Sequence, residues 1–305
     1  MSNERYLNHP TFGLLYRVAE AGEGRELYAT LYAQRMFFLV TVQGRSVEFE
    51  VIPLMDARHL AEQNLNRARR EGPEVHAGWR ELFDKTFIQR LGPSPAAARL
   101  QALNEQLPAH TRLLAVSKGH PASSIRALAQ AGQRSFGESR LQEAMAKQQE
   151  LADLDGLDWH FIGHLQANKV RPVLKQFSAI HSVDSLALAE RVSRIAGEEG
   201  LRPAVFLQVK LRPDPNKGGL SADALEQEWP RLQQLPNLRI VGLMTMAPLG
   251  LEAPQRQVLF AECSALAQRL GLPELSMGMS GDWPEAAAAG STWVRVGSAL
   301  FGPKP

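Results

Sequence analysis

The sequence predicts an α/β protein in which a small antiparallel β domain precedes a closed β/α barrel. From about residue 94 onward, apolar runs alternate with helical patterns along the rest of the chain. Several runs, such as 204–207 and 240–244, are apolar without alternation, which is typical of parallel strands buried on both faces. All four tyrosines lie before residue 33, whereas the first lysine is Lys85, which indicates two modules.

The first 90 residues favour an antiparallel sheet with two helices after it. Strands rich in β-branched and aromatic residues are expected at 12–18, 27–32, 35–42 and 47–52. Asp56 is expected to cap a helix that ends near Arg70, and a second helix is expected over 75–89. The resulting division is a β domain (1–53), a two-helix extension (54–90), a linker (91–98) and the barrel (99–305).

The barrel is predicted from its strand and helix repeats. Strands are expected at 112–118, 134–138, 159–163, 179–184, 204–210, 238–247, 275–280 and 293–301. Helices are expected at 121–131, 141–151, 165–177, 186–199, 221–235, 255–270 and 284–289. Eight strands in roughly 210 residues correspond to the small end of the size range of a (β/α)8 barrel.

Composition excludes several classes of protein. A net charge of +2 is too small for nucleic-acid binding through bulk electrostatics. The single cysteine, Cys263, fits a reducing compartment and is expected to be a buried hydrophobe rather than a nucleophile. Neither a signal peptide nor an apolar stretch of membrane-spanning length is recognisable. We therefore expect a cytoplasmic protein with no membrane contact, no direct DNA binding and no metal site.

The candidate site consists of an amine and an anion cradle. Lys118 ends the first barrel strand, Ser280 and Gly281 follow the seventh, and Arg295, Gly297 and Ser298 belong to the eighth. In a closed barrel the first and last strands are neighbours, and phosphate is usually bound after strands seven and eight. A desolvated lysine there could form a Schiff base with an aldehyde whose phosphate the cradle binds.

Each of these residues also has a structural interpretation. Lys118 could be a surface lysine, and Ser280 and Gly281 could form a plain turn with Asp282 capping the next helix. Arg295 could belong to an internal salt bridge. The convergence of all the elements is what favours a bound phosphate-bearing aldehyde.

The barrel resembles the pyridoxal phosphate homeostasis protein family over nearly all of 94–302. The motifs that carry the resemblance are Leu114–Lys118, Phe136–Glu138, Trp159–Lys169, Gly242–Pro248, Leu275–Ser280 and Gly290–Gly302. The resemblance implies a barrel of the alanine racemase N-terminal type with pyridoxal 5'-phosphate bound covalently to Lys118. The cofactor-binding residues that it implies are Lys118, Ser139, Met244, Ser276, Ser280, Arg295, Gly297 and Ser298. Ser139 departs from the asparagine usual in that family.

The resemblance implies a cofactor carrier rather than a catalyst. Racemases of this barrel class use a lysine together with a tyrosine, and residues 91–305 contain no tyrosine. His160 and His164 remain as candidates for a second base, so an amino-acid racemase is the alternative. A phosphosugar enzyme with Lys118 attacking a ketose is a further alternative. Whether Arg295 faces the phosphate or the pyridine nitrogen stays open.

The first module resembles the cyanobacterial PipX family over about 1–89, on Tyr6–Arg17 and Glu26–Val40. That family combines a Tudor-like β domain with two helices, and the resemblance implies two partners, the PII signalling protein and the transcription factor NtcA. The implied contact residues are Glu4, Tyr6, Phe12, Tyr32, Gln34, Arg35 and Phe38. The whole chain is then expected to join a nitrogen-control transcription co-activator to a pyridoxal phosphate regulator.

Overall fold

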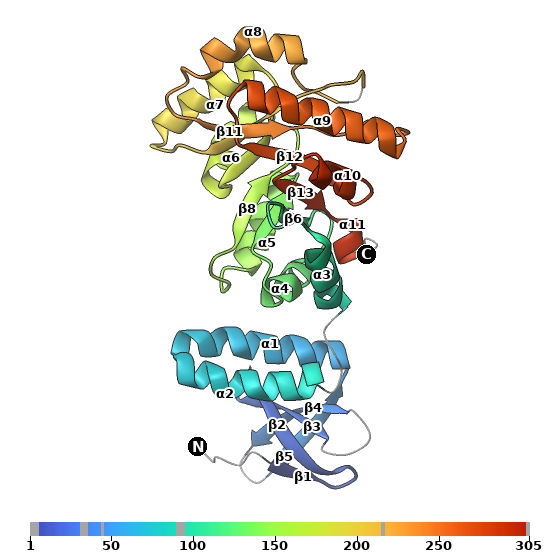
Figure 1. Cartoon of the computed structure of the whole chain (residues 1–305). Helices are drawn as coiled ribbons and strands as arrows, with labels where there is room; N and C mark the ends of the chain where they lie inside the picture. The colour runs from blue at the N-terminus through green and yellow to red at the C-terminus, as the bar shows by residue number, and fades with distance from the viewer. Residues whose placement is uncertain (1–5, 31–35, 44–45, 90–94, 215–216, 303–305) are drawn as a thin grey trace. The chain divides into compact units, whose positions relative to one another are not determined.

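The chain divides into two compact units, residues 1–94 and 95–305, and each unit has its own core (Figure 1). The computed structural model describes residues 6–30, 36–43, 46–89, 95–214 and 217–302. None of the helices in these ranges has the length and apolar character needed to cross a bilayer.

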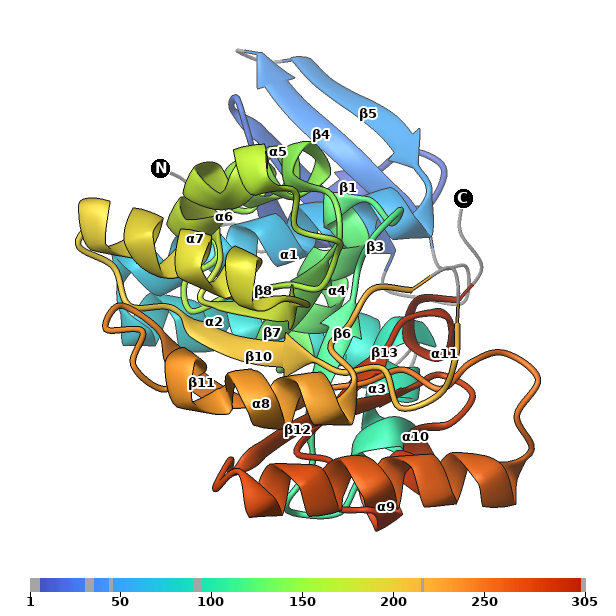
Figure 2. The same ribbon diagram turned by 90° about the horizontal axis from the view of Figure 1, so that it is seen from above.

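The first unit contains a curved antiparallel sheet with its strands in chain order. The strands are β1 (Tyr6–His9), β2 (Gly13–Gly22), β3 (Arg25–Thr30), β4 (Phe37–Gln43) and β5 (Ser46–Ile52). Figure 2 shows β4 and β5 as a long neighbouring pair. The sequence does not predict β1, because its four residues form no apolar run and none of them is fully buried. Parts of the expected strands at 27–32 and 35–42 lie outside the described residues.

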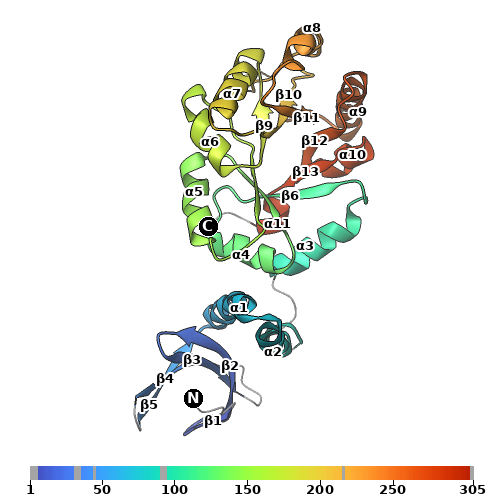
Figure 3. The same ribbon diagram turned by 90° about the vertical axis from the view of Figure 1, so that its left-hand side faces the viewer.

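Two helices cover one face of this sheet (Figure 3). Helix α1 (Leu54–Glu71) is followed by α2 (Pro73–Phe83) and by a π-helical turn, η1 (Asp84–Gln89). Gly72 separates α1 from α2 with φ +134°, a value that side-chain-bearing residues rarely adopt. The expectation that Asp56 caps α1 is wrong, since Pro53 is the N-cap and Asp56 lies within the first turn.

The second unit is a closed barrel of eight parallel strands. The strands are β6 (Arg112–Val116), β7 (Ser135–Glu138), β8 (Asp158–Phe161), β9 (Ala179–Val183), β10 (Ala204–Gln208), β11 (Arg239–Met244), β12 (Glu274–Met279) and β13 (Trp293–Val296). Closure comes from β13 pairing with β6, with Arg295 opposite Leu114 and Val296 opposite Ala115. The predicted fold class is thereby confirmed, as is the number of barrel strands.

Helices surround the barrel strands (Figure 3). They are α3 (Pro95–Gln106), α4 (Ala122–Gln130), α5 (Leu141–Glu150), η2 (Ala167–Lys169), α6 (Val170–Gln176), α7 (Leu186–Glu198), α8 (Ala222–Leu232), α9 (Ala253–Arg269), α10 (Trp283–Ala288) and α11 (Ser298–Phe301). Two expectations are wrong here. The eighth strand ends at Val296 instead of residue 301, because α11 follows Gly297. Residues 95–98 of the expected linker belong to α3.

Cys263 lies in the barrel core, as expected for a buried hydrophobe. Its side chain on α9 is completely buried beside Leu259 and Leu266. Burial raises the pKa of the Cys263 thiol to about 12, which leaves it protonated and unreactive.

Close strand packing predicts a strong effect of one added methyl group. A Cβ at Gly242 of β11 would lie 2.0 Å from the Glu274 carbonyl oxygen of β12. Gly242→Ala is therefore expected to lower the free energy of unfolding by about 2–3 kcal/mol in urea denaturation followed by circular dichroism. At Gly281 a Cβ meets nothing within 4 Å, so Gly281→Ala is the matched control. Equal stability of both variants would contradict this packing.

Candidate functional site

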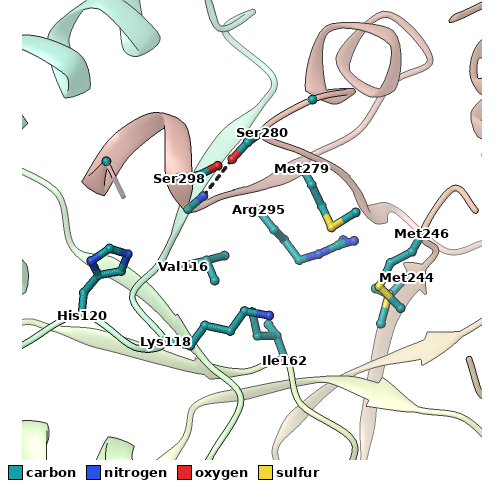
Figure 4. Close-up of a pocket in the computed structure, with 13 residues that line it drawn as sticks. Val116, Lys118, His120, Ile162, Met244, Met246, Met279, Ser280, Arg295 and Ser298 are labelled. Carbon is teal, nitrogen blue, oxygen red and sulfur yellow. Dashed lines mark hydrogen bonds between the residues drawn. The ribbon is translucent and has the colours of Figure 1, made fainter. Parts of the chain in front are cut away.

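A cavity of about 430 Å³ opens at the carboxyl ends of the barrel strands. Its walls combine apolar and polar residues, several of them labelled in Figure 4. The lining residues are Val116, Lys118, His120, Ile162, Met244, Met246, Met279, Ser280, Gly281, Arg295, Gly297, Ser298 and Gly302. Parallel strands all end at this face, so residues distant in the sequence meet here.

Lys118 lies at the rim of the cavity, two residues beyond the end of β6. The residue is exposed, so the expectation that burial desolvates its amine is wrong. Its Nζ makes no hydrogen bond or ion pair with a described residue, and Figure 4 shows the side chain extending along the cavity wall. The amine is therefore available to a ligand.

The loops after β12 and β13 form a polar cradle. The Ser280 hydroxyl accepts a hydrogen bond from the Gly297 amide at 3.2 Å (Figure 4). A Cβ at Gly297 would lie only 3.3 Å from the Val116 carbonyl oxygen, so glycine allows the β13 backbone to approach β6 closely. The hydroxyls of Ser280 and Ser298 supply further donors on the same side of the cavity.

Arg295 is a buried cation beside the cavity. Its Nη1 donates to the Ser276 carbonyl (2.5 Å) and hydroxyl (2.8 Å), and its Nη2 donates to the Thr245 carbonyl (3.0 Å). Desolvation lowers the pKa of Arg295 to about 10, so the guanidinium remains charged at neutral pH. Because these partners are neutral oxygens, the geometry does not favour the alternative in which Arg295 belongs to an internal salt bridge.

A hydrogen-bonded chain runs from Arg295 through the barrel interior. Ser276 Oγ lies 2.7 Å from His181 Nδ1, His181 Nε2 lies 2.9 Å from His160 Nδ1, and His160 Nε2 lies 2.7 Å from Asp158 Oδ2. Arginine can only donate, so the Ser276 hydroxyl accepts from Arg295. At the other end, the Asp158 carboxylate accepts from His160 Nε2. The chain thus joins a buried cation to a carboxylate through a hydroxyl and two imidazoles.

The pKa values of the chain agree with neutral imidazole at its centre. Burial lowers the pKa of His181 well below 6.5, and the nearby His160 and Arg295 lower it further. Burial alone would raise the pKa of Asp158, but the hydrogen bond and charge of His160 lower it overall. The chain thus ends in a carboxylate at the beginning of β8.

The predicted cofactor residues fall into two groups. Lys118, Met244, Ser280, Arg295, Gly297 and Ser298 line the cavity. Ser276 does not line it and instead lies buried behind Arg295. Ser139 does not line it either, since its backbone packs against Gly163.

Sequence reasoning missed several lining residues. They are Val116, His120, Ile162, Met246, Met279 and Gly302, whereas Gly281 was expected in the cradle and does line the cavity. All of them except Gly302, which follows α11, lie at or after the carboxyl ends of barrel strands, and this position was the signal that could have found them. Neither His160 nor His164 lines the cavity, because His160 is in the interior chain and His164 is 74% exposed near Asp184.

The expected partner surface of the first unit is only partly described. Glu4, Tyr32, Gln34 and Arg35 lie outside the described residues. Tyr6 is 53% exposed, whereas Phe12 is half-buried. Phe38 is completely buried against His9 and Phe49, so the expectation that it contacts a partner directly is wrong.

Comparisons with known proteins divide the chain at the same place. Residues 3–87 match the family model of PipX, PII-interacting protein X, and residues 95–305 match that of the alanine racemase N-terminal domain. A pyridoxal phosphate homeostasis protein of Synechocystis is 50% identical over 202 residues, covering 64% of this chain and 93% of the relative. The Pseudomonas aeruginosa relative of the same name is 46% identical, covering 64% and 85%.

Solved structures match the barrel as well. PipY of Synechococcus elongatus with bound PLP is 54% identical, with a TM-score of 0.66, covering 68% of this chain and all of PipY. An alanine racemase of Clostridium difficile shares the fold at 17% identity, with a TM-score of 0.58, covering 69% of this chain and 57% of the racemase.

The buried histidine predicts acid sensitivity. Below about pH 6.5 the unfolded chain binds a proton that folded His181 does not, so stability falls as the pH falls, by up to about 1.4 kcal/mol per pH unit. His181→Gln should remove this contribution. The loss of unfolding free energy between pH 7.5 and 5.5, measured in urea, should be smaller by about 1.4 kcal/mol than in the wild type.

The comparison of the wild type with His181→Gln isolates the contribution of His181 to the pH dependence of stability. The depressed pKa of Asp158 stabilises the fold above about pH 4, and this contribution is lost only at lower pH. The raised pKa of Glu138 favours the folded state at lower pH, which opposes the effect of His181. This contribution is the same in the wild type and in His181→Gln. His164→Gln, at an exposed position, is the matched control. An unchanged pH dependence in His181→Gln would refute the assignment.

Proposed function

Because this chain belongs to the pyridoxal phosphate homeostasis proteins, whose barrel is the alanine racemase N-terminal domain, we propose that it is a non-catalytic regulator with pyridoxal 5'-phosphate as its cofactor. The first unit adds a module that binds the PII signalling protein. The observation that carries the proposal is the meeting of an available amine and a serine–glycine cradle at one cavity. We place the protein in the cytoplasm.

The residues present fit the cofactor. When bound, pyridoxal phosphate supplies an aldehyde that condenses with a primary amine and an anionic phosphate that needs hydrogen-bond donors. Lys118 would hold the aldehyde end, and Ser280, Gly297 and Ser298 would hold the phosphate. The walls beside Arg295 are largely apolar and include Met244 and Ile162, which suits a planar ring. The cavity volume lies within the range of small-molecule sites.

Arg295 contributes fixed charge rather than phosphate binding. Both of its Nη groups already donate to Ser276 and Thr245, which hold the guanidinium on the barrel side of the cavity. Phosphate recognition would therefore fall to the Ser280–Ser298 side. A cation held in this way stabilises negative charge near it without being free to move toward a substrate.

The lining chemistry favours a carrier over a racemase. Among the described lining residues, an amine and an imidazole, those of Lys118 and His120, are the side chains of the types that usually act as general acids or bases. His120 is buried and stacks on Phe301 at 4.8 Å, which fixes its ring. A racemase needs a second mobile acid or base opposite the lysine. Rapid formation of D-amino acids by the purified protein would favour the racemase and contradict our proposal.

The first unit supports a role in nitrogen control. Its match to the PII-interacting protein X model covers residues 3–87, and exposed Tyr6 on β1 is the described residue best suited to anchor a partner. We propose that PII and a transcription factor of the NtcA type compete for this unit, so that any effect on DNA is indirect. The fused barrel would then connect nitrogen signalling to cofactor supply.

Lys118→Ala is expected to abolish covalent cofactor attachment. Borohydride reduction followed by mass spectrometry should locate the adduct at Lys118 in the wild type and find none in the variant, because no other amine lines the described cavity. Lys175→Ala, at an exposed lysine of α6, is the control and should keep the adduct. An adduct of equal yield in Lys118→Ala would overturn the assignment.

Tyr6→Ala is expected to weaken PII binding at least about tenfold, since exposed aromatic residues often anchor interfaces. Isothermal titration of the full chain with PII measures the effect, and the pyridoxal phosphate content should not change. Val51→Ala is the control, because Val51 is 57% exposed on β5 of the same sheet. Equal affinities of Tyr6→Ala and the wild type would remove Tyr6 from the proposed surface.

A further inference from the structure

A buried ion cluster lies directly behind Lys118. Glu138 at the end of β7 is completely buried, and Lys147 of α5 is 5% exposed. Lys147 Nζ lies 2.7 Å from Glu138 Oε1 and 2.6 Å from Glu143 Oε1. A buried charged group is costly unless it is paired, so such a cluster needs a compensating role or very good geometry.

The cluster holds the backbone on both sides of Lys118. Lys147 Nζ donates to the Ser117 carbonyl at 2.9 Å, and the Gly119 amide donates to Glu143 Oε1 at 2.5 Å. The Ser117 hydroxyl also donates to Glu138 Oε1 at 2.7 Å. The peptide groups immediately before and after Lys118 are thus fixed by one set of charges.

The bonding pattern defines the protonation state of Lys147. Its three acceptors, which belong to Ser117, Glu138 and Glu143, require the three N–H donors of an ammonium group. Lys147 is therefore saturated and cannot act as a nucleophile. Lys118, only one residue beyond Ser117, keeps its Nζ available at the cavity rim.

The segment needs this restraint because glycine follows the lysine. Gly119 adopts φ +75°, and glycine can leave that conformation more easily than any other residue. Without the bond from its amide to Glu143, the Lys118–Gly119 peptide could rotate and carry the lysine stem away from the cavity.

We propose that Lys147, held by Glu138 and Glu143, is a positioning residue that presents Lys118 to the cofactor. The inference rests on the proposed function only where it concerns the cofactor. The restraint on the backbone of residues 117–119 is a property of the chain itself and can be measured separately.

The variants must separate positioning from folding. Burial raises the pKa of Glu138, and its bonds to Lys147 and Ser117 oppose the rise, so Lys147→Met leaves a buried acid that can destabilise the fold. Glu143→Ala is the second variant, because it removes the acceptor for Gly119 while the Glu138–Lys147 pair remains. Lys175→Met and Glu150→Ala are the controls, the latter on the same helix as Glu143.

Hydrogen–deuterium exchange on the full chain without cofactor measures the restraint. The Gly119 amide should exchange about tenfold faster in Glu143→Ala and in folded Lys147→Met than in the wild type, because each change removes a charge-assisted bond from the segment. The controls should exchange at the wild-type rate. Unchanged exchange at Gly119 in Glu143→Ala would overturn the proposal.

Cofactor attachment measures the consequence. The rate of adduct formation at Lys118, trapped with borohydride and followed against pH, should fall about tenfold in the same variants, while the controls keep the wild-type rate. Faster exchange with an unchanged attachment rate would overturn the positioning role. If the wild type takes up no pyridoxal phosphate, the proposed function fails, and the exchange comparison still decides whether the cluster restrains this segment.

Discussion

The pairing of β13 with β6 is the constraint on which the site depends. It places Val296 opposite Ala115, although about 180 residues separate them in sequence. Lys118 follows the end of β6 and the Gly297–Ser298 segment follows the end of β13, so closing the barrel brings amine and cradle to one rim. Opening this pair would leave each half of the site without its partner, whatever the state of the other strands.

Polar groups inside the barrel act in two separate systems. One is the chain from Arg295 to Asp158, in which His181 is neutral. The other is the cluster around Lys147, which restrains the segment that carries Lys118. Buried networks of this kind limit the arrangements that a core can adopt, because displacing a member leaves its bonded neighbours without a partner.

Much of the fold could be predicted from local patterns, whereas the details of the site could not. Apolar runs alternating with helical patterns revealed all eight barrel strands, and motif residues such as Ser280 and Gly297 marked the cradle. The end of β13 was missed because residues 298–301 are apolar enough to continue a strand. In the structure they form α11, with Gly297 as its N-cap. Lys147 was missed because a lysine on an amphipathic helix usually faces water, and only the three-dimensional packing buries it.

The contacts of the buried guanidinium have an electrical consequence. Its Nη groups are bonded to the lone pairs of three neutral oxygens, the Ser276 carbonyl and hydroxyl and the Thr245 carbonyl. These oriented dipoles offset part of the cost of removing a cation from water, and they do so without carrying a charge themselves.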